Sequence, residues 1–165
     1  MVRRVAKYGI LAILVVFVGI QIVPYGRSHD NPPVILEPEW DVPITRDLAV
    51  RACFDCHSNE TYWPWYTKIA PVSWWTQEHV DEGRDELNFS EWSWANDEID
   101  EIAESVMEGE MPPTYYNLVP GSRVLSGNER EQLIRGLIAT FNDSPNAQQS
   151  SDHDDDDDDG NGHDR

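Results

Sequence analysis

The residues best suited to carry chemistry form the segment Cys53-Phe54-Asp55-Cys56-His57. Two thiols separated by two residues, with an imidazole directly after the second thiol, are the pattern at which a c-type haem is attached. Each Cys can form a thioether with a haem vinyl group, which holds the adjacent His where a ring nitrogen reaches the iron from the proximal side. The segment therefore predicts one covalent haem c, bound by Cys53 and Cys56 and ligated by His57.

A structural zinc site, a redox dithiol, a disulfide and coincidence are the other interpretations of this segment. A closed zinc site needs four ligands, and beyond these residues the chain offers no further Cys and only scattered His. A redox Cys-x-x-Cys usually starts a helix in a βαβ context, and no such pattern surrounds the motif. Haem attachment is therefore the favoured interpretation.

A second axial ligand would decide what the iron can do, and the candidates are Met111, Met107 and His79. Met111 begins a Met-Pro-Pro loop between the last two predicted helices. The prolines stiffen the loop that would present its sulfur to the iron, so we expect Met111 to be the distal ligand. Met107 fits the apolar stripe of a helix, where an isolated Met usually fills a core. Ligation by His79 in a bis-His site is the alternative.

Four stretches with helical periodicity surround these residues. They cover residues 45–52, 72–87, 97–108 and 126–141. Thr45 is an acceptable N-cap for the first, Gly109 ends the third, and Ser126 with Glu129 forms a capping box on the fourth. No segment alternates convincingly with period two. We therefore predict an all-α, cytochrome c-like helical domain around the covalent haem.

Aromatic residues are unusually dense after the motif. They are Tyr62, Trp63, Trp65, Tyr66, Trp74, Trp75, Phe89, Trp92 and Trp94. A haem presents a large flat apolar surface that aromatic rings cover well, so we expect this group to pack on it. Trp63, Trp74 and Tyr115 are the residues expected to line the haem pocket. The alternatives are an ordinary aromatic core and an exposed recognition patch.

Residues 1–27 are predicted to be a membrane anchor. Basic residues precede a stretch without charge from Tyr8 to Gly26, which borders on the length of a spanning helix. No Ala-x-Ala-like spacing follows, so an uncleaved single-pass transmembrane helix is favoured over a cleaved signal peptide. The basic residues would leave the N-terminus in the cytoplasm and the haem domain on the periplasmic side of a bacterial inner membrane. Thioether attachment of haem in bacteria occurs after export, which agrees with this topology.

The remaining organisation follows from composition. Residues 28–43 read as a Pro-rich spacer, residues 44–141 as the c-type haem-binding domain, and residues 142–165 as a disordered acidic tail. The net charge of −19 is not confined to that tail, because the middle of the chain is itself strongly acidic. Nucleic-acid binding is therefore disfavoured, and a redox partner protein with a basic docking face is favoured.

From residue 52 to residue 133 the chain resembles the small c-type haem-binding domain family of exported bacterial proteins. The matching pieces are Cys53-Phe54-Asp55-Cys56-His57-Ser58-Asn59, Trp63-Pro64-Trp65-Tyr66, Ile69-Ala70-Pro71-Val72-Ser73-Trp74, Glu82-Gly83-Arg84, Leu87-Asn88-Phe89-Ser90-Glu91-Trp92, Gly109-Glu110-Met111-Pro112-Pro113, and Leu125-Ser126 with Glu129-Arg130. The resemblance implies covalent haem through Cys53 and Cys56, with His57 as iron ligand and Met111 as its partner. It implies little about the physiological role.

The predicted function is that of a membrane-anchored monohaem cytochrome, a one-electron carrier rather than an enzyme. Ligation by a His and a Met leaves no open site for a substrate. The alternative is a haem-based sensor or gas-binding module with an open or displaceable sixth site, which would follow if Met111 were not a ligand. A peroxidase-like enzyme is disfavoured because no distal His/Arg pair is evident. We expect Arg84 to form a salt bridge or to bind a haem propionate.

Overall fold

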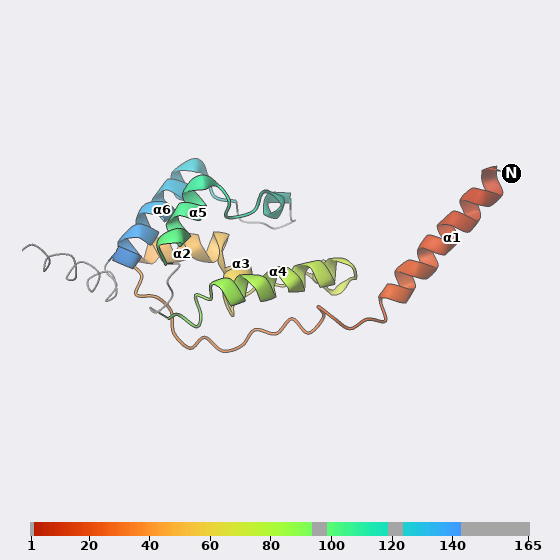
Figure 1. Cartoon of the computed structure of the whole chain (residues 1–165), viewed down its shortest axis with the longest axis horizontal. Helices are drawn as coiled ribbons and strands as arrows, with labels where there is room; N and C mark the ends of the chain where they lie inside the picture. The colour runs from red at the N-terminus through yellow and green to blue at the C-terminus, as the bar shows by residue number, and fades with distance from the viewer. Residues whose placement is uncertain (1, 94–98, 119–123, 143–165) are drawn as a thin grey trace, which may run out of the picture. The chain divides into compact units, whose positions relative to one another are not determined.

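The computed structural model describes residues 2–93, 99–118 and 124–142, and the regular secondary structure of this part of the chain is helical (Figure 1). Its helices are α1 (Val2–Ile20), α2 (Pro43–Ala52), α3 (Phe54–His57), α4 (Val72–Glu86), α5 (Ile99–Glu108) and α6 (Gly127–Asn142), with the 3-10 helices η1 (Trp65–Lys68) and η2 (Thr114–Leu118). Within these ranges, strand-like pairing is limited to one bridge between Leu36 and Glu91. The predicted all-α class is confirmed.

The chain divides into two compact units. Unit 1 comprises residues 1–34 and 54–90, and unit 2 comprises residues 35–53 and 91–165. The chain crosses from unit 2 to unit 1 between Cys53 and Phe54, inside the motif. Cys53 therefore belongs to one unit, while Cys56 and His57 belong to the other.

Unit 1 is built on the packing of α3 against α4 (Figure 1). Helix α4 covers almost the whole predicted range, and it begins directly after Pro71. Phe54 in α3 and Phe89 after α4 stack with their ring centroids 5.5 Å apart. Both rings are almost completely buried, so they form an apolar anchor beneath the motif.

The N-terminal part of unit 1 is held by polar contacts. The Gln21 side chain donates to the Ala70 carbonyl over 2.9 Å and accepts from the Ala70 amide over 3.1 Å. Gly26 has a φ of +72°, and a Cβ there would lie 2.1 Å from the Ser73 carbonyl oxygen. Only glycine meets both conditions. Residues 21–26 are thus bound to the start of α4.

Unit 2 is built on α6, which packs against both α2 and α5 (Figure 1). Its core consists of apolar residues from all three helices: Leu48, Ala49, Ala103, Val106, Leu133, Leu137 and Phe141. The start of α2 differs from the expectation. Val42 is its N-cap and Pro43 occupies the first turn, a position that suits proline. Thr45 lies inside the helix and is buried where a Cβ on Gly136 would come within 2.1 Å of its hydroxyl oxygen.

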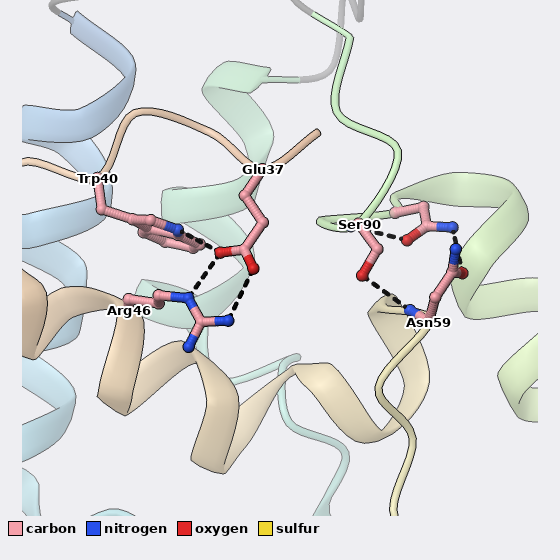
Figure 2. A network of polar contacts seen from close by, with 6 residues as sticks. Glu37, Trp40, Arg46, Asn59 and Ser90 are labelled. Carbon is pink, nitrogen blue, oxygen red and sulfur yellow. Dashed lines mark hydrogen bonds and ion pairs between the residues drawn. The ribbon is translucent and has the colours of Figure 1, made fainter. Parts of the chain in front are cut away.

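Each unit contains a polar network (Figure 2). In unit 2, Arg46 donates to both Glu37 carboxylate oxygens over 2.6 and 2.7 Å, and the Trp40 indole donates to one of them over 3.0 Å. The hydrogen bond from Arg46 is the main reason why the pKa of Glu37 is lowered. In unit 1, the Asn59 amide donates to the Ser90 hydroxyl over 2.9 Å. The first network ties the segment before α2 to that helix, and the second ties the segment after α3 to the segment after α4.

The predicted membrane anchor is wrong. The structure contains, within the residues it describes, no helix long and apolar enough to span a membrane. Helix α1 ends at Ile20 and its first turns carry Arg3, Arg4 and Lys7, so only residues 8–20 form an uncharged helix. At 1.5 Å per residue this part is roughly 20 Å long, whereas the hydrocarbon core of a bilayer is about 30 Å thick. The predicted location in an inner membrane was inferred from this anchor, so that prediction is wrong as well.

Three further predictions concern residues outside the described ranges. They are the packing of Trp94, the start of the third predicted helix at residues 97–98, and the acidic tail beyond residue 142. These stay predictions.

Candidate haem-binding site

The two cysteines of the motif lie at a helix end and on a short helical turn. The Cys53 amide donates to the Ala49 carbonyl over 2.8 Å and so closes α2. Cys56 lies in α3, which is held in place by the buried ring of Phe54. Neither cysteine is part of a disulfide, and both residues are partly exposed. Covalent attachment of haem requires two thiols that are not tied up in a disulfide, and this pair meets that condition.

The imidazole of His57 is held in a defined orientation. Its Nδ1 atom lies 3.2 Å from the Leu87 carbonyl oxygen, and since a carbonyl can only accept, Nδ1 carries the proton. The lone pair is then on Nε2, the arrangement in which a backbone carbonyl orients a metal-binding His. Burial lowers the pKa of His57, while the carbonyls of Leu87 and Gly83 and the charge of Glu86 act against this. The ring is therefore neutral and ready to act as a ligand at neutral pH.

Helices α3 and α4 lie very close together at Gly83. A Cβ on this residue would lie 2.7 Å from the Cys56 carbonyl oxygen, closer than packed atoms allow. Burial, followed by the charge of Asp55, raises the pKa of Cys56 to about 11. Redox-active cysteines have lowered pKa values, so the environment of Cys56 argues against the redox dithiol interpretation.

Arg84 connects the segment after the motif to the N-terminal part of unit 1. Its guanidinium donates to the Ser58 carbonyl over 2.8 Å, to the Thr61 hydroxyl over 3.0 Å, to the Asn31 side chain over 3.2 Å and to the Asp30 carbonyl over 3.2 Å. These four acceptors are neutral oxygens, two on the backbone and two on side chains, so Arg84 acts here as a clamp between the two segments. The expected salt bridge or contact with a haem propionate stays a prediction.

The predicted pocket residue Trp63 packs against the N-terminal segment. Its ring stacks on His29 with the centroids 4.4 Å apart and the planes within 6°. Its indole nitrogen donates to Asn31 over 3.0 Å, and Asn31 in turn donates to the Thr61 carbonyl over 2.9 Å. Trp63 thus contributes to the same contact region as Arg84.

Trp74 offers the clearest fit to a bound group. Its indole nitrogen is buried and has no hydrogen-bond partner among the described residues, although buried indole N–H groups normally find an acceptor. A haem propionate is an acceptor of the right kind. Together with the thiol of Cys56 and the oriented imidazole of His57, this unmet donor makes the residues of unit 1 compatible with haem.

The other aromatic residues lie in different environments, some in an ordinary core and others exposed on the surface. Phe89 and Trp92 belong to ordinary cores, where Trp92 stacks on Phe141 with the ring centroids 5.1 Å apart. Trp65 is 76% exposed. Tyr115, the third predicted pocket residue, lies in η2 of unit 2 and is exposed.

The candidates for the distal ligand lie in different settings. Met111 follows α5 in unit 2, and its side chain is 38% exposed. Met107 is 56% exposed, so the prediction that it fills a core is wrong. His79 in unit 1 lies one turn after Trp75 on α4, with Nδ1 2.8 Å from the Trp75 carbonyl oxygen and the two rings in contact.

Fold and site together define a small helical domain with a motif for attaching haem. The chain belongs to the haem-binding domain family, whose model matches residues 15–139. The match begins within α1 and includes every residue predicted for the site. Comparison with curated proteins finds no match, and comparison with solved structures finds none either.

Some residues that build this site were not anticipated for that role. Gly83 was visible as an isolated glycine inside a helical pattern, which often marks close packing. His29 and Asn31 had no signal, because their partners are distant in sequence and partly backbone atoms.

Proposed function

We propose that this protein is a monohaem c-type cytochrome that carries single electrons. Cys53 and Cys56 hold the haem covalently, and His57 is the proximal ligand of its iron. The observation that carries the proposal is the orientation of His57, whose Nδ1 donates to the Leu87 carbonyl so that Nε2 is left to a metal. Membership of the haem-binding domain family supports the cofactor.

The chain's own groups have simple tasks in this function. Each thiol gives its sulfur to one carbon and its hydrogen to the other carbon of a vinyl double bond, so no further reactant is consumed. His57 then holds the iron, whose change of oxidation state by one electron is the chemistry that haem supplies when bound. Electron transfer of this kind needs no acid, base or nucleophile from the protein.

Met111 is the second axial ligand in this proposal. A thioether ligand raises the reduction potential and occupies the position at which a small molecule would bind. The acidic surface selects a redox partner with a basic docking face, in agreement with the net charge of −19. If Met111 is not a ligand, the sixth position is open and a gas-binding sensor becomes the better description.

The covalent attachment is tested by extracting the purified protein with acidified solvent. We expect haem to stay with the wild-type chain and to be released from a Cys53→Ala, Cys56→Ala double variant. Release from the wild type would show that the attachment is not covalent.

The distal ligand is tested by absorption spectra of the oxidised and reduced protein with and without carbon monoxide. Met111→Ala should abolish the sulfur-to-iron charge-transfer band and allow carbon monoxide to bind, whereas Met107→Ala, which removes a more exposed thioether, should change neither. Ready binding of carbon monoxide to the reduced wild type would favour the sensor over the electron carrier.

A further inference from the structure

We propose that Arg130 positions Met111, by holding the C-terminal end of α5 next to the turn that carries this residue. The inference rests on the proposed function, because Met111 is the proposed distal ligand. All the contacts that carry it lie within unit 2.

Arg130 satisfies carbonyl groups that a helix end leaves without partners. Its Nε donates to the Val106 carbonyl over 3.0 Å, and one terminal nitrogen donates to the Met107 carbonyl over 3.1 Å and also to that of Val106. The last carbonyls of a helix lack intrahelical donors. A positive charge at this end also interacts favourably with the negative end of the helix dipole. The planar guanidinium can bind two successive carbonyls in a way that an ammonium group cannot.

The turn after α5 transmits this constraint to Met111. Gly109 has a φ of +84°, and the amides of Glu110 and Met111 both donate to the Ser105 carbonyl, over 3.0 and 3.1 Å. A Cβ on Gly109 would lie 3.2 Å from a terminal nitrogen of Arg130. The guanidinium thus lies against bare backbone, two residues before the proposed ligand.

The support for Arg130 comes from the first turn of α6. Its neighbour Glu129 accepts from Arg51 of α2 over 2.5 Å and from the Ser126 hydroxyl over 2.8 Å. Arg51 precedes Cys53 by two positions. The same turn of α6 therefore holds the end of α2, where Cys53 lies, and the end of α5, from which Met111 follows.

Arg130 is needed because the side chain of Met111 is not fixed by a core. It is more than one third exposed, so the contacts that place it act mainly through its backbone. A side chain placed in this way should move when the end of the helix is released. Arg130 is thus a positioning residue, and its effect should appear in the properties of the iron.

The test compares Arg130→Gln and Arg130→Lys with Arg135→Gln in the full haem-loaded chain. Arg135 is a matched control, because its side chain is 70% exposed and it pairs with Glu131 only over 3.9 Å. In Arg130→Gln we expect unchanged covalent haem, a weaker sulfur-to-iron band, a lower reduction potential and faster binding of carbon monoxide. Arg130→Lys should restore part of the wild-type behaviour, and Arg135→Gln should match the wild type.

Hydrogen exchange at the amides of Glu110 and Met111 measures how firmly the turn after α5 is held, and this measurement does not depend on the iron. In Arg130→Gln this exchange should be roughly tenfold faster than in Arg135→Gln, as expected when a hydrogen bond to a charged group is lost. If Arg130→Gln does not fold, Arg130→Lys is measured in its place. Unchanged exchange in the folded variant would overturn the proposal.

The outcome for Met111→Ala separates this proposal from the proposed function. If that variant keeps the wild-type spectrum and potential, ligation by Met111 fails, and with it the role of Arg130 in placing a ligand. If Met111→Ala changes both properties while Arg130→Gln changes neither, the cytochrome function stands and the role of Arg130 is refuted.

Discussion

The surroundings of His57 and of Met111 are constructed in opposite ways. The side chain of His57 is half-buried and hydrogen-bonded, and its helical turn is fixed by Phe54, Gly83 and the clamp of Arg84. The side chain of Met111 is partly exposed, and the contacts that hold it act through its backbone. The proposed proximal ligand is thus held by the packing of the protein itself, whereas the position of the proposed distal ligand depends on how a turn is held. Changes in unit 1 should affect stability and attachment, and changes around Met111 should affect the tuning of the iron.

Gly83→Ala should have the largest effect among substitutions that leave the haem-binding groups intact. Alanine normally stabilises a helix by about 1 kcal/mol relative to glycine, but here its Cβ would lie 2.7 Å from the Cys56 carbonyl oxygen. Overpacking of this kind typically costs about 1–3 kcal/mol. We expect a lower denaturation midpoint and a lower yield of covalent haem.

Gly127→Ala is the control for Gly83→Ala, since Gly127 lies in α6 and a Cβ there meets nothing within 4 Å. It should leave the midpoint unchanged or raise it slightly. Equal stability of the two variants would remove the evidence that α3 and α4 are closely fitted at the motif.

Arg84→Gln should have an intermediate effect. The substitution removes the charged donor that ties Ser58 to Asp30 and Asn31, and hydrogen bonds to charged groups contribute about 1.5–3 kcal/mol. Because the contacts with Asp30 and Asn31 are exposed to solvent, urea denaturation should show a loss at the lower end of that range, with Arg84→Lys between the variant and the wild type. Lys68→Gln, which changes an exposed residue of η1, should cause little loss. An Arg84→Gln variant as stable as Lys68→Gln would indicate that the proximal site does not depend on the clamp.

Glu129 should show the smallest effect, visible in the pH dependence of stability. The hydrogen bond from Arg51, helped by those from Ser126, lowers the pKa of Glu129 to about 2 from an ordinary value of 4.5. A lowered folded-state pKa means that the charged carboxylate stabilises the fold above pH 4.5 and that this contribution is lost as the pH falls toward 2. The side chains of Arg51 and Glu129 are each about one third exposed, so solvent weakens the attraction between their charges.

Thermal unfolding of Glu129→Gln and the wild type across this pH range checks the expectation. The difference in stability should be complete at pH 7, shrink below about pH 4.5 and vanish near pH 2. A difference that stays constant over this range would mean that the contact with Arg51 contributes nothing.

Local signals in the sequence were sufficient for the motif and for several helix ends. Gly109 ends α5 with a positive φ, and Ser126 with Glu129 forms the expected capping box at the start of α6. These features depend on residues three or four positions apart, so a single sequence contains all the information needed. The same holds for the haem motif, whose five residues are contiguous.

The predictions that failed depended on contacts distant in sequence or on where a helix ends. Thr45 resembles an N-cap, but its burial beneath Gly136 is fixed by the packing of α2 on α6. The contacts of Arg84 and Arg130 were not predicted, because their partners are distant in sequence and include backbone carbonyls, which no sequence pattern marks. The uncharged stretch after Lys7 continued past Ile20, but the helix did not.

The contacts of residues 21–33 show which part of the chain before the motif is needed to support it. Gln21 is bound to Ala70, His29 to Trp63, Asn31 to Thr61 and Pro33 to Asn59. A minimal domain that consisted of α2, the motif and the helices after it would lack Gln21, His29, Asn31 and Pro33. The smallest portable form of this haem site therefore begins near Gln21, and a graft of the five-residue motif alone would leave behind the segment that supports it.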